Sequence, residues 1–331
     1  MAKARVAING FGRIGRAAFK IGNNSKSIEF VAINDLSPVP TLAHLLKYDS
    51  VYGRYIGKVE AADNALVVDK KKILVFAEND PKKLQWKKLK VDVVLECTGK
   101  FVKDGAAKVH IEAGAKRVIV SAPAKGEGDV KTFLLGVNEK EYKQQKVISN
   151  ASCTTNCVAP VAFVLQKNFG IEKGMVTTVH AYTGAQSLVD GNNKDLRRAR
   201  SAAINIIPTT TGAAIATGEV VSGLENRFDG MAIRVPVVNG SLSDFTVLLK
   251  RNTTVEELNK ALVEYAKKNK EVMEVTTDPI VSTDIIGNSH SAIVDLSLTK
   301  VVGGNLVKVF AWYDNEWGYA NRLVEEIALV T

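Results

Sequence analysis

The sequence predicts an α/β protein in which a doubly wound parallel sheet is followed by a second domain. Three observations support this prediction. Short apolar runs alternate with helical stretches through residues 1–150, a glycine-rich turn stands at the first strand–helix junction, and 331 residues are enough for two hydrophobic cores.

The first half follows a strand–helix rhythm. Apolar runs bounded by turn residues predict buried strands over residues 5–9, 28–34, 91–96 and 117–121. Helical spacing is found over residues 13–21, 41–48 and 104–113. Strands joined through helices pair in parallel by right-handed crossovers. A further candidate, an antiparallel insertion after a turn, covers residues 72–76.

The first strand–helix junction carries a dinucleotide-binding fingerprint. Gly10, Gly12 and Gly15 form a Gly-x-Gly-x-x-Gly motif, and Asp35 ends the next strand 20 residues after Gly15. The glycines would permit a tight turn, approach of a pyrophosphate and close helix–strand packing, and the helix N-terminus offers N–H groups to phosphates. Asp35 would bind ribose hydroxyls and repel a 2′-phosphate, which favours NAD over NADP. The alternative is a structural turn with a strand-end aspartate.

Two later strands end in small polar residues, Thr98 and Ser121. Because carboxyl ends of parallel strands line the ligand crevice, both are candidate cofactor contacts. Ordinary turn chemistry is the alternative for each.

The second half holds a candidate nucleophile, Cys153. Cap-forming residues around Ser152 precede a stretch with helical spacing to about Gln166, which places Cys153 at a helix N-terminus. We expect the helix dipole to lower the pKa of its thiol, and Pro160 to kink the helix or remove one hydrogen bond. Cys157 is either a second reactive group or a packing thiol. No ligand spacing nearby indicates a metal site.

A thiolate nucleophile needs a proton acceptor, and His180 is the best placed of the four histidines. It follows an apolar strand predicted over residues 175–179 and begins a polar loop. His290, in a polar turn, is a weaker rival. His44 and His110 lie in predicted helices and are interpreted as surface or packing residues.

Candidate anion-binding groups gather in the same half. Residues 194–200 place three arginines in a loop-to-helix segment, and residues 208–212 bring hydroxyls and N–H groups to the start of an alanine-rich helix. Arg234 lies in a strand predicted over residues 231–237, where an unpaired buried charge would be costly. The alternatives for these three features are a solvated face, a helix cap and a half-exposed strand residue. Together with a nucleophile and a dinucleotide site, the features suggest a phosphorylated substrate.

The net charge of +9 is unevenly distributed. Residues 1–150 carry 27 basic and 16 acidic side chains, and 22 of the basic ones are lysines in runs that resemble a solvated surface. Because no aromatic ladder or zinc-finger spacing accompanies them, we do not expect specific nucleic-acid binding. The absence of a long apolar run argues against a membrane span, and three cysteines fit a reducing compartment. A cytoplasmic protein is therefore expected.

Over essentially its whole length the sequence resembles the phosphorylating glyceraldehyde-3-phosphate dehydrogenases, in their bacterial and plastid branch. The resemblance is carried by five segments: INGFGRIGR, SNASCTTN, TVHAYT around His180, NIIPTTTGA and WYDNEWGY. It implies a Rossmann-type NAD-binding domain over residues 1–150, an α+β catalytic domain with a mixed or antiparallel sheet over residues 151–315, and a C-terminal helix, residues 316–331, that returns to the first domain.

The resemblance also implies an activity and its residues. The family oxidises D-glyceraldehyde 3-phosphate to 1,3-bisphosphoglycerate, reducing NAD, through a hemithioacetal and a thioester on a cysteine. The resemblance implies that Cys153 is the nucleophile and that His180 is its base. Positions that hold the substrate phosphate and inorganic phosphate correspond to Ser152, Thr154, Thr183, Arg198, Thr211, Gly212 and Arg234. Positions that contact NAD correspond to Arg13, Ile14, Asp35, Asn79, Ser121 and Asn315, with Asn315 at the nicotinamide carboxamide.

Two departures from the family pattern concern the cofactor. Asn79 stands where this branch usually has arginine, a mild change because the family contact there is largely through the backbone. Gly191-Asn192 replaces the Leu-Pro of NAD-specific relatives, in a loop that approaches the adenosine ribose bound to a neighbouring subunit. We therefore expect a preference for NAD with some NADP use.

The resemblance implies a homotetramer that binds a small-molecule substrate and inorganic phosphate. Two enzymatic rivals remain. An erythrose-4-phosphate dehydrogenase shares most of these motifs, whereas a Cys/His hydrolase or acyltransferase would not need the fingerprint with Asp35.

Overall fold

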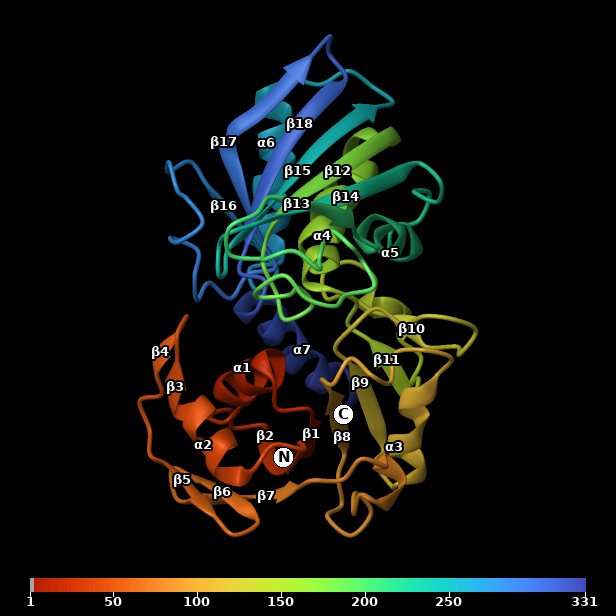
Figure 1. The fold of residues 1–331 in the computed structure, drawn as a ribbon. Coiled ribbons are helices and arrows are strands. Elements are labelled where there is room, and N and C mark those ends of the chain that lie inside the picture. The colour runs from red at the N-terminus through yellow and green to blue at the C-terminus, as the bar shows by residue number, and fades with distance from the viewer. Residues whose placement is uncertain (1–2) are drawn as a thin grey trace. The chain divides into compact units, whose positions relative to one another are not determined.

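The computed structural model describes residues 3–331, which form two compact units (Figure 1). The first contains the chain up to Phe133, Glu139–Ala151 and Ala320–Thr331. The second contains Leu134–Asn138 and Ser152–Tyr319. Each unit is built around its own sheet.

The sheet of the first unit is mainly parallel, as the sequence predicts. Its strand order is β10-β11-β9-β8-β1-β2-β7-β6-β5, and the pairs from β10 to β7 are all parallel. The strands are β1 (Ala4–Asn9), β2 (Ile28–Asn34), β5 (Val59–Ala62), β6 (Ala65–Val68), β7 (Lys71–Phe76), β8 (Val93–Glu96), β9 (Arg117–Val120), β10 (Lys131–Thr132) and β11 (Val147–Ser149). A separate antiparallel pair consists of β3 (Tyr48–Asp49) and β4 (Gly53–Arg54).

The predicted insertion at residues 72–76 is more closely integrated than expected. It is β7, which pairs antiparallel with β6 but parallel with β2. Asp69 and Lys70 both have positive φ, 49° and 69°, which gives the β6–β7 turn the twist that a two-residue hairpin requires.

The helices of the first unit are α1 (Arg13–Gly22), α2 (Val39–Lys47), α3 (Val109–Glu112) and, from Ala320 on, most of α7 (Trp317–Val330). The helix predicted over residues 104–113 is wrong at its start, because Asp104 and Gly105 have left-handed φ values of 50° and 69°. A 3₁₀ turn, Ala106–Lys108, precedes the single turn of α3. The core includes Val6, Ala7 and Ile8 of β1, which are fully buried.

The second unit has a mixed sheet, in agreement with the resemblance. Its strand order is β13-β14-β12-β15-β18-β17-β16; β12 pairs parallel with β14, β16 pairs parallel with β17, and the other pairs are antiparallel. The strands are β12 (Ile171–Ala181), β13 (Ile207–Thr210), β14 (Phe228–Val235), β15 (Ser241–Leu249), β16 (Met273–Thr276), β17 (Ala292–Val302) and β18 (Leu306–Tyr313). The helices are α4 (Cys153–Phe169), α5 (Ala213–Val220), α6 (Val255–Lys268) and the start of α7 (Trp317–Val330).

The segment at residues 194–200 forms turns and no helix, contrary to the prediction. The side chain of Asn193 accepts from the N–H of Asp195 at 3.1 Å, and that of Asp195 accepts from the N–H of Arg197 at 2.9 Å. Such short side-chain bonds compete with helical hydrogen bonds, which accounts for the difference.

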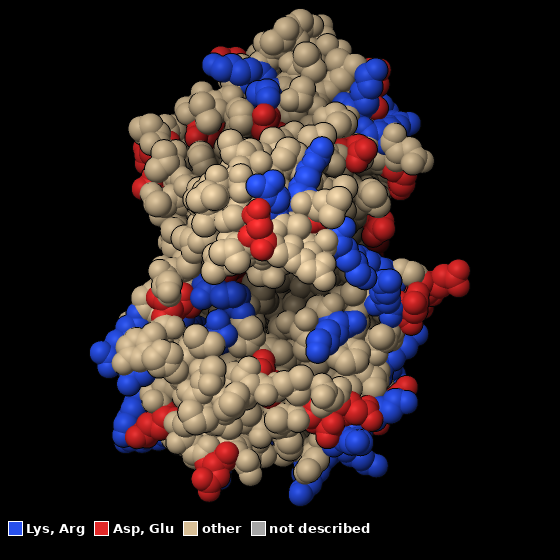
Figure 2. Space-filling model, in the orientation of Figure 1, with Lys and Arg blue, Asp and Glu red and all other residues tan. Residues whose placement is uncertain are grey.

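The charged side chains are dispersed over the face of the molecule that Figure 2 shows. On the face shown in Figure 2, Lys and Arg side chains stand singly or in small groups among acidic and uncharged ones. No helix within residues 3–331 is long and apolar enough to cross a membrane.

Candidate active site

The glycine-rich turn of the first unit has the shape of a phosphate cradle. Gly10 has φ +93°, and a Cβ there would lie 2.8 Å from the backbone nitrogen of Thr98. A Cβ on Gly15 would overlap the carbonyl oxygen of Gly10, whereas one on Gly12 would meet nothing within 4 Å. The chain is therefore packed tightly behind the turn and open at Gly12, where a pyrophosphate is expected.

Asp35 lies next to this turn. Its carboxylate accepts hydrogen bonds from the N–H of Phe11 at 2.8 Å and from the N–H of Ser37 at 2.9 Å. A groove of about 290 Å³ opens beside it, and its lining includes Gly10, Gly12, Asp35, Asn79 and Thr98. Of the predicted cofactor residues, the structure thus brings these five together.

Arg13, Ile14 and Ser121 do not line this groove. The guanidinium of Arg13 pairs with Asp49, with Nη1 3.0 Å from Oδ1. Ile14 is the second residue of α1 and half-buried. The N–H of Ser121, just after β9, donates to the carbonyl oxygen of Glu96 at 2.9 Å. No acidic residue stands in the first turn of α1, which leaves that helix N-terminus suitable for an anion.

In the second unit, Cys153 is the first residue of α4, as predicted. Ser152 is the N-cap, and its hydroxyl accepts from the N–H of Thr155 at 3.0 Å. This bond satisfies one of the unpaired donors of the first turn and fixes where the helix begins. The helix continues to Phe169 with Pro160 inside it.

The thiol of Cys153 faces His180, with Sγ 3.5 Å from Nε2. Burial raises the pKa of the Cys153 thiol, whereas the charge of Arg234 and the hydroxyl and N–H of Thr154 lower it. The net direction is upward, so the predicted lowering is wrong for this structure. The N–H groups of the helix start act as expected, but burial outweighs them.

Arg234 lies on the other side of His180, because parallel pairing of β12 and β14 places these residues opposite each other. Its Nη1 is 2.7 Å from His180 Nδ1 and 3.0 Å from the carbonyl oxygen of Ala181. The same Nδ1 lies 2.6 Å from the carbonyl oxygen of Ala181, so it faces a donor and an acceptor at once. With its hydrogen on Nε2 the imidazole accepts from Arg234; with its hydrogen on Nδ1 it donates to Ala181 and turns an unprotonated Nε2 toward Cys153. Burial and the charge of Arg234 lower the pKa of His180 to about 3, so its imidazole is neutral near pH 7.

Tyr313 is a member of the site that sequence reasoning missed. Its hydroxyl lies 3.0 Å from Thr154 Oγ1 and 2.7 Å from Thr178 Oγ1, and its ring meets that of His180 edge-on, with centroids 5.9 Å apart. Thr154, a predicted phosphate ligand, therefore directs its buried hydroxyl at Tyr313. The sequence signals were its place at the end of an apolar run and inside WYDNEWGY, one of the segments that carry the family resemblance.

The other residues predicted to bind phosphate lie on the loops after β12 and β13. Arg198 Nε donates to Thr209 Oγ1 at 2.9 Å, and Arg198 Nη2 donates to the carbonyl oxygen of Thr210 at 3.1 Å. Thr211 Oγ1 accepts from the N–H of Ala213 at 3.2 Å, next to Gly212, the N-cap of α5.

Two more of the predicted residues are held by their neighbours. Thr183 accepts from the N–H of Ala185 at 3.4 Å. Asn315 is nearly buried, and its Oδ1 accepts from Ser241 Oγ at 2.8 Å and from the N–H of Gly240 at 3.2 Å. This fixes the orientation of its amide group.

The structure resolves two alternatives. Cys157 is fully buried, with Sγ 3.7 Å from the carbonyl oxygen of Ala311, and burial raises the pKa of its thiol, so it packs in the core. His290 Nδ1 lies 3.1 Å from Glu274, which leaves His180 as the partner of Cys153. Within residues 3–331, no group of three or more His, Cys, Asp or Glu side chains is arranged to hold a metal ion.

Comparison with known proteins gives consistent matches along the chain. Residues 4–104 match the family model "Glyceraldehyde 3-phosphate dehydrogenase, NAD binding domain", and residues 152–315 match "Glyceraldehyde 3-phosphate dehydrogenase, C-terminal domain". The chain is 55% identical to the glyceraldehyde-3-phosphate dehydrogenase of Thermotoga maritima over 331 residues, covering 99% of both proteins. It is 50% identical to that of Clostridium acetobutylicum, covering 98% of both, and 51% identical to that of Geobacillus stearothermophilus, again covering 98% of both.

Proposed function

Because the chain belongs to the glyceraldehyde-3-phosphate dehydrogenase family, we propose that it oxidises and phosphorylates D-glyceraldehyde 3-phosphate to 1,3-bisphosphoglycerate, reversibly and with NAD. One observation carries the proposal: Cys153 Sγ lies 3.5 Å from His180 Nε2 at the start of α4. A cysteine at the N-terminus of a helix and beside a histidine is suited to forming a covalent bond to a carbonyl carbon.

The first step is attack of Cys153 on the aldehyde. In the free protein His180 is neutral, and its Nδ1 lies between Arg234 Nη1 at 2.7 Å and the carbonyl oxygen of Ala181 at 2.6 Å. We propose that an anionic phosphate draws the Arg234 guanidinium away, so that Nδ1–H can donate to the carbonyl oxygen of Ala181. Nε2 then takes the thiol proton, and Sγ bonds to the aldehyde carbon to form a hemithioacetal.

The oxygen of that hemithioacetal needs donors. The N–H of Cys153 is one of those that the helix leaves without an intrahelical acceptor, and a protonated Nε2 of His180 is the second. Tyr313 holds the imidazole edge-on, which fixes the direction of Nε2.

Bound NAD supplies the hydride acceptor for the next stage. Loss of hydride from the carbon of the hemithioacetal alkoxide leaves a thioester on Cys153, while Nε2 of His180 keeps the proton taken from the thiol. Attack by inorganic phosphate breaks the carbon–sulfur bond, releases the acyl phosphate and returns the thiolate. Arg234, Arg198 and the hydroxyl of Thr183 are proposed to hold the two phosphate groups, together with Ser152, Thr211 and Gly212.

We assign cofactor binding to residues 1–150 with the C-terminal helix of residues 316–331, and catalysis to residues 151–315. The division of the chain into two units near Ala151 supports this assignment. Asp35, held at the groove by two N–H groups, supports the preference for NAD. Asn192 is exposed in a loop without proline, and we propose that it permits some NADP use.

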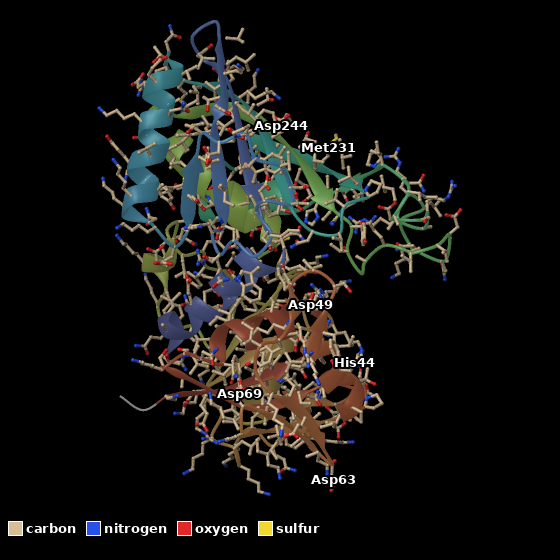
Figure 3. All side chains as sticks on the ribbon, turned by 90° about the vertical axis from the view of Figure 1, so that its left-hand side faces the viewer. His44, Asp49, Asp63, Asp69, Met231 and Asp244 are labelled. Atoms are coloured by element: carbon tan, nitrogen blue, oxygen red, sulfur yellow. The ribbon has the colours of Figure 1, made fainter. Side chains whose placement is uncertain are left out.

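We also propose a homotetramer in the cytoplasm. The strand register places Met175, Met231 and Leu306 on one face of the second sheet, and they are 51%, 47% and 41% exposed. Met231 is labelled in Figure 3. The loop after β12 adds further exposed apolar side chains, among them Leu188, Leu196 and Ile206. A surface of this kind marks a protein interface. Three free cysteines fit a reducing compartment.

The test is a steady-state assay of NADH formation from glyceraldehyde 3-phosphate with and without inorganic phosphate, with NADP and erythrose 4-phosphate in parallel. Phosphate-dependent turnover with NAD and glyceraldehyde 3-phosphate is expected. Faster turnover of erythrose 4-phosphate would instead indicate that substrate, and hydrolysis of acyl substrates without NAD would identify a hydrolase.

A further inference from the structure

A chain of buried polar side chains lies beside the dinucleotide groove of the first unit. Trp86 Nε1 donates to His110 Nδ1 at 3.1 Å, and His110 Nε2 lies 2.9 Å from Glu96 Oε2. Asn9 Nδ2 donates to the same carboxylate at 2.5 Å. All four side chains are at most 1% exposed.

Trp86 fixes which groups donate and which accept in this series of hydrogen bonds. Because an indole N–H only donates, His110 Nδ1 is an acceptor, and its hydrogen is on Nε2. The imidazole therefore donates to Glu96. A buried carboxylate is costly unless it is fully hydrogen-bonded, so Trp86 indirectly secures the geometry around Glu96.

The second carboxylate oxygen of Glu96 accepts hydrogen bonds from Thr98. Glu96 Oε1 accepts from the N–H of Thr98 at 2.8 Å and also from the Thr98 hydroxyl. All the groups around this carboxylate are donors.

Thr98 and Asn9 connect Glu96 to the groove, since both line it. Thr98 packs directly behind the glycine-rich turn, where a Cβ on Gly10 would lie 2.9 Å from its Cγ2. Asn9 precedes that turn and accepts from Asn34 Nδ2 at 2.7 Å. The carboxylate thereby joins the ends of β1, β2 and β8, where the cofactor is expected.

We propose that Glu96 is a positioning residue for NAD, acting through Thr98 and Asn9. The proposal rests on the NAD-dependent function proposed above. Within the described residues, Asn9 and Thr98 line the groove, whereas Glu96 and His110 do not. Glu96 and His110 therefore act on the cofactor only through Asn9 and Thr98.

The experiment is isothermal titration calorimetry of NAD with E96Q, with Glu112→Gln as the matched control. Glu112 is an exposed carboxylate on α3 that pairs with Lys82. Glutamine keeps the shape of Glu96 but turns an amide toward surrounding donors, so we expect NAD to bind about tenfold or more weakly. E112Q is expected to bind NAD like the wild type.

A second pair of variants acts at His110 and covers the case in which E96Q does not fold. His110→Phe removes the donor to Glu96, and His110→Gln retains an N–H for it. We expect weaker NAD binding for H110F and substantial rescue in H110Q. Alkylation of Cys153 without NAD should be unchanged in all of them, because Cys153 belongs to the second unit.

The readout separates this proposal from the proposed function. Wild-type NAD affinity in E96Q and H110F would overturn the positioning role, as would an equal loss of NAD binding and of Cys153 alkylation. Failure of the wild type to oxidise glyceraldehyde 3-phosphate would overturn the proposed function while the NAD titrations could still be interpreted.

Discussion

Arg234 Nη1 lies 2.7 Å from His180 Nδ1, on the opposite side of the imidazole from Cys153 Sγ. One cation thus influences both partners of the proposed catalytic pair. Its charge lowers the pKa of the Cys153 thiol, which favours thiolate, and lowers the pKa of His180, which favours neutral imidazole. An anion that neutralises Arg234 would raise both.

Replacing this cation should shift both titrations upward. In Arg234→Leu the pKa of His180 rises, because a neighbouring positive charge no longer opposes protonation, and that of Cys153 rises because its thiolate loses a stabilising charge. We expect kcat/KM for the phosphorylated aldehyde to fall about 10- to 100-fold through lost charge-assisted hydrogen bonds. The pH profile of iodoacetamide alkylation measures the thiol, and a profile that moves to lower pH would contradict this account.

His180→Asn should slow both alkylation of Cys153 near neutral pH and steady-state turnover. Loss of a positioned proton acceptor typically costs about 10²- to 10⁴-fold in rate. The control is His44→Asn, an exposed histidine of α2 in the first unit. Unchanged alkylation in H180N would remove His180 from the role of base.

The Arg13–Asp49 pair should make stability depend on pH. Burial raises the pKa of Asp49, but the N–H groups of Val51 and Tyr52 and the Arg13 guanidinium outweigh it and lower the pKa to about 2. A depressed carboxyl pKa stabilises the fold above the unfolded value near 3.8 and loses that contribution as the pH falls toward 2. Asp49→Asn should therefore cost on the order of 1 kcal/mol at pH 7, after allowance for solvent screening, and less at pH 3.5.

Urea unfolding of D49N and the wild type at both pH values measures this difference. A difference in the free energy of unfolding that grows as the pH falls would contradict the assignment.

Asn192→Pro should raise the ratio of the specificity constants for NAD and NADP, by a few-fold. Asn192 is exposed, and proline would limit the conformations of its loop. Kinetics with both cofactors measure the ratio. If it does not change, Asp35 alone sets the preference.

Local features of the sequence were the most predictable. Gly15 is required by the carbonyl oxygen of Gly10 in the same turn, and the Ser152 cap lies beside the cysteine it positions, so neighbouring residues were sufficient for both. The opposition of His180 and Arg234 depends on parallel pairing across 54 residues, which no local pattern records.

Long-range contacts also explain what sequence reasoning missed. Tyr313 reaches Thr154 and Thr178 from a distant strand. His110, interpreted as a surface or packing residue, is a buried packing residue, but its hydrogen bond to Glu96 was not predicted. Burial of Cys153 raises its pKa despite its place at a helix start, because desolvation depends on the whole surrounding structure.

The most direct test of the central claim is mass spectrometry of the protein mixed with glyceraldehyde 3-phosphate and NAD in the absence of phosphate. We expect an acyl group bound to Cys153 as a thioester, its discharge to an acyl phosphate when inorganic phosphate is added, and no adduct in a folded Cys153→Ser variant that still binds NAD. Oxidation of the aldehyde by Cys153→Ser at the wild-type rate, or an acyl group on another residue, would contradict the account.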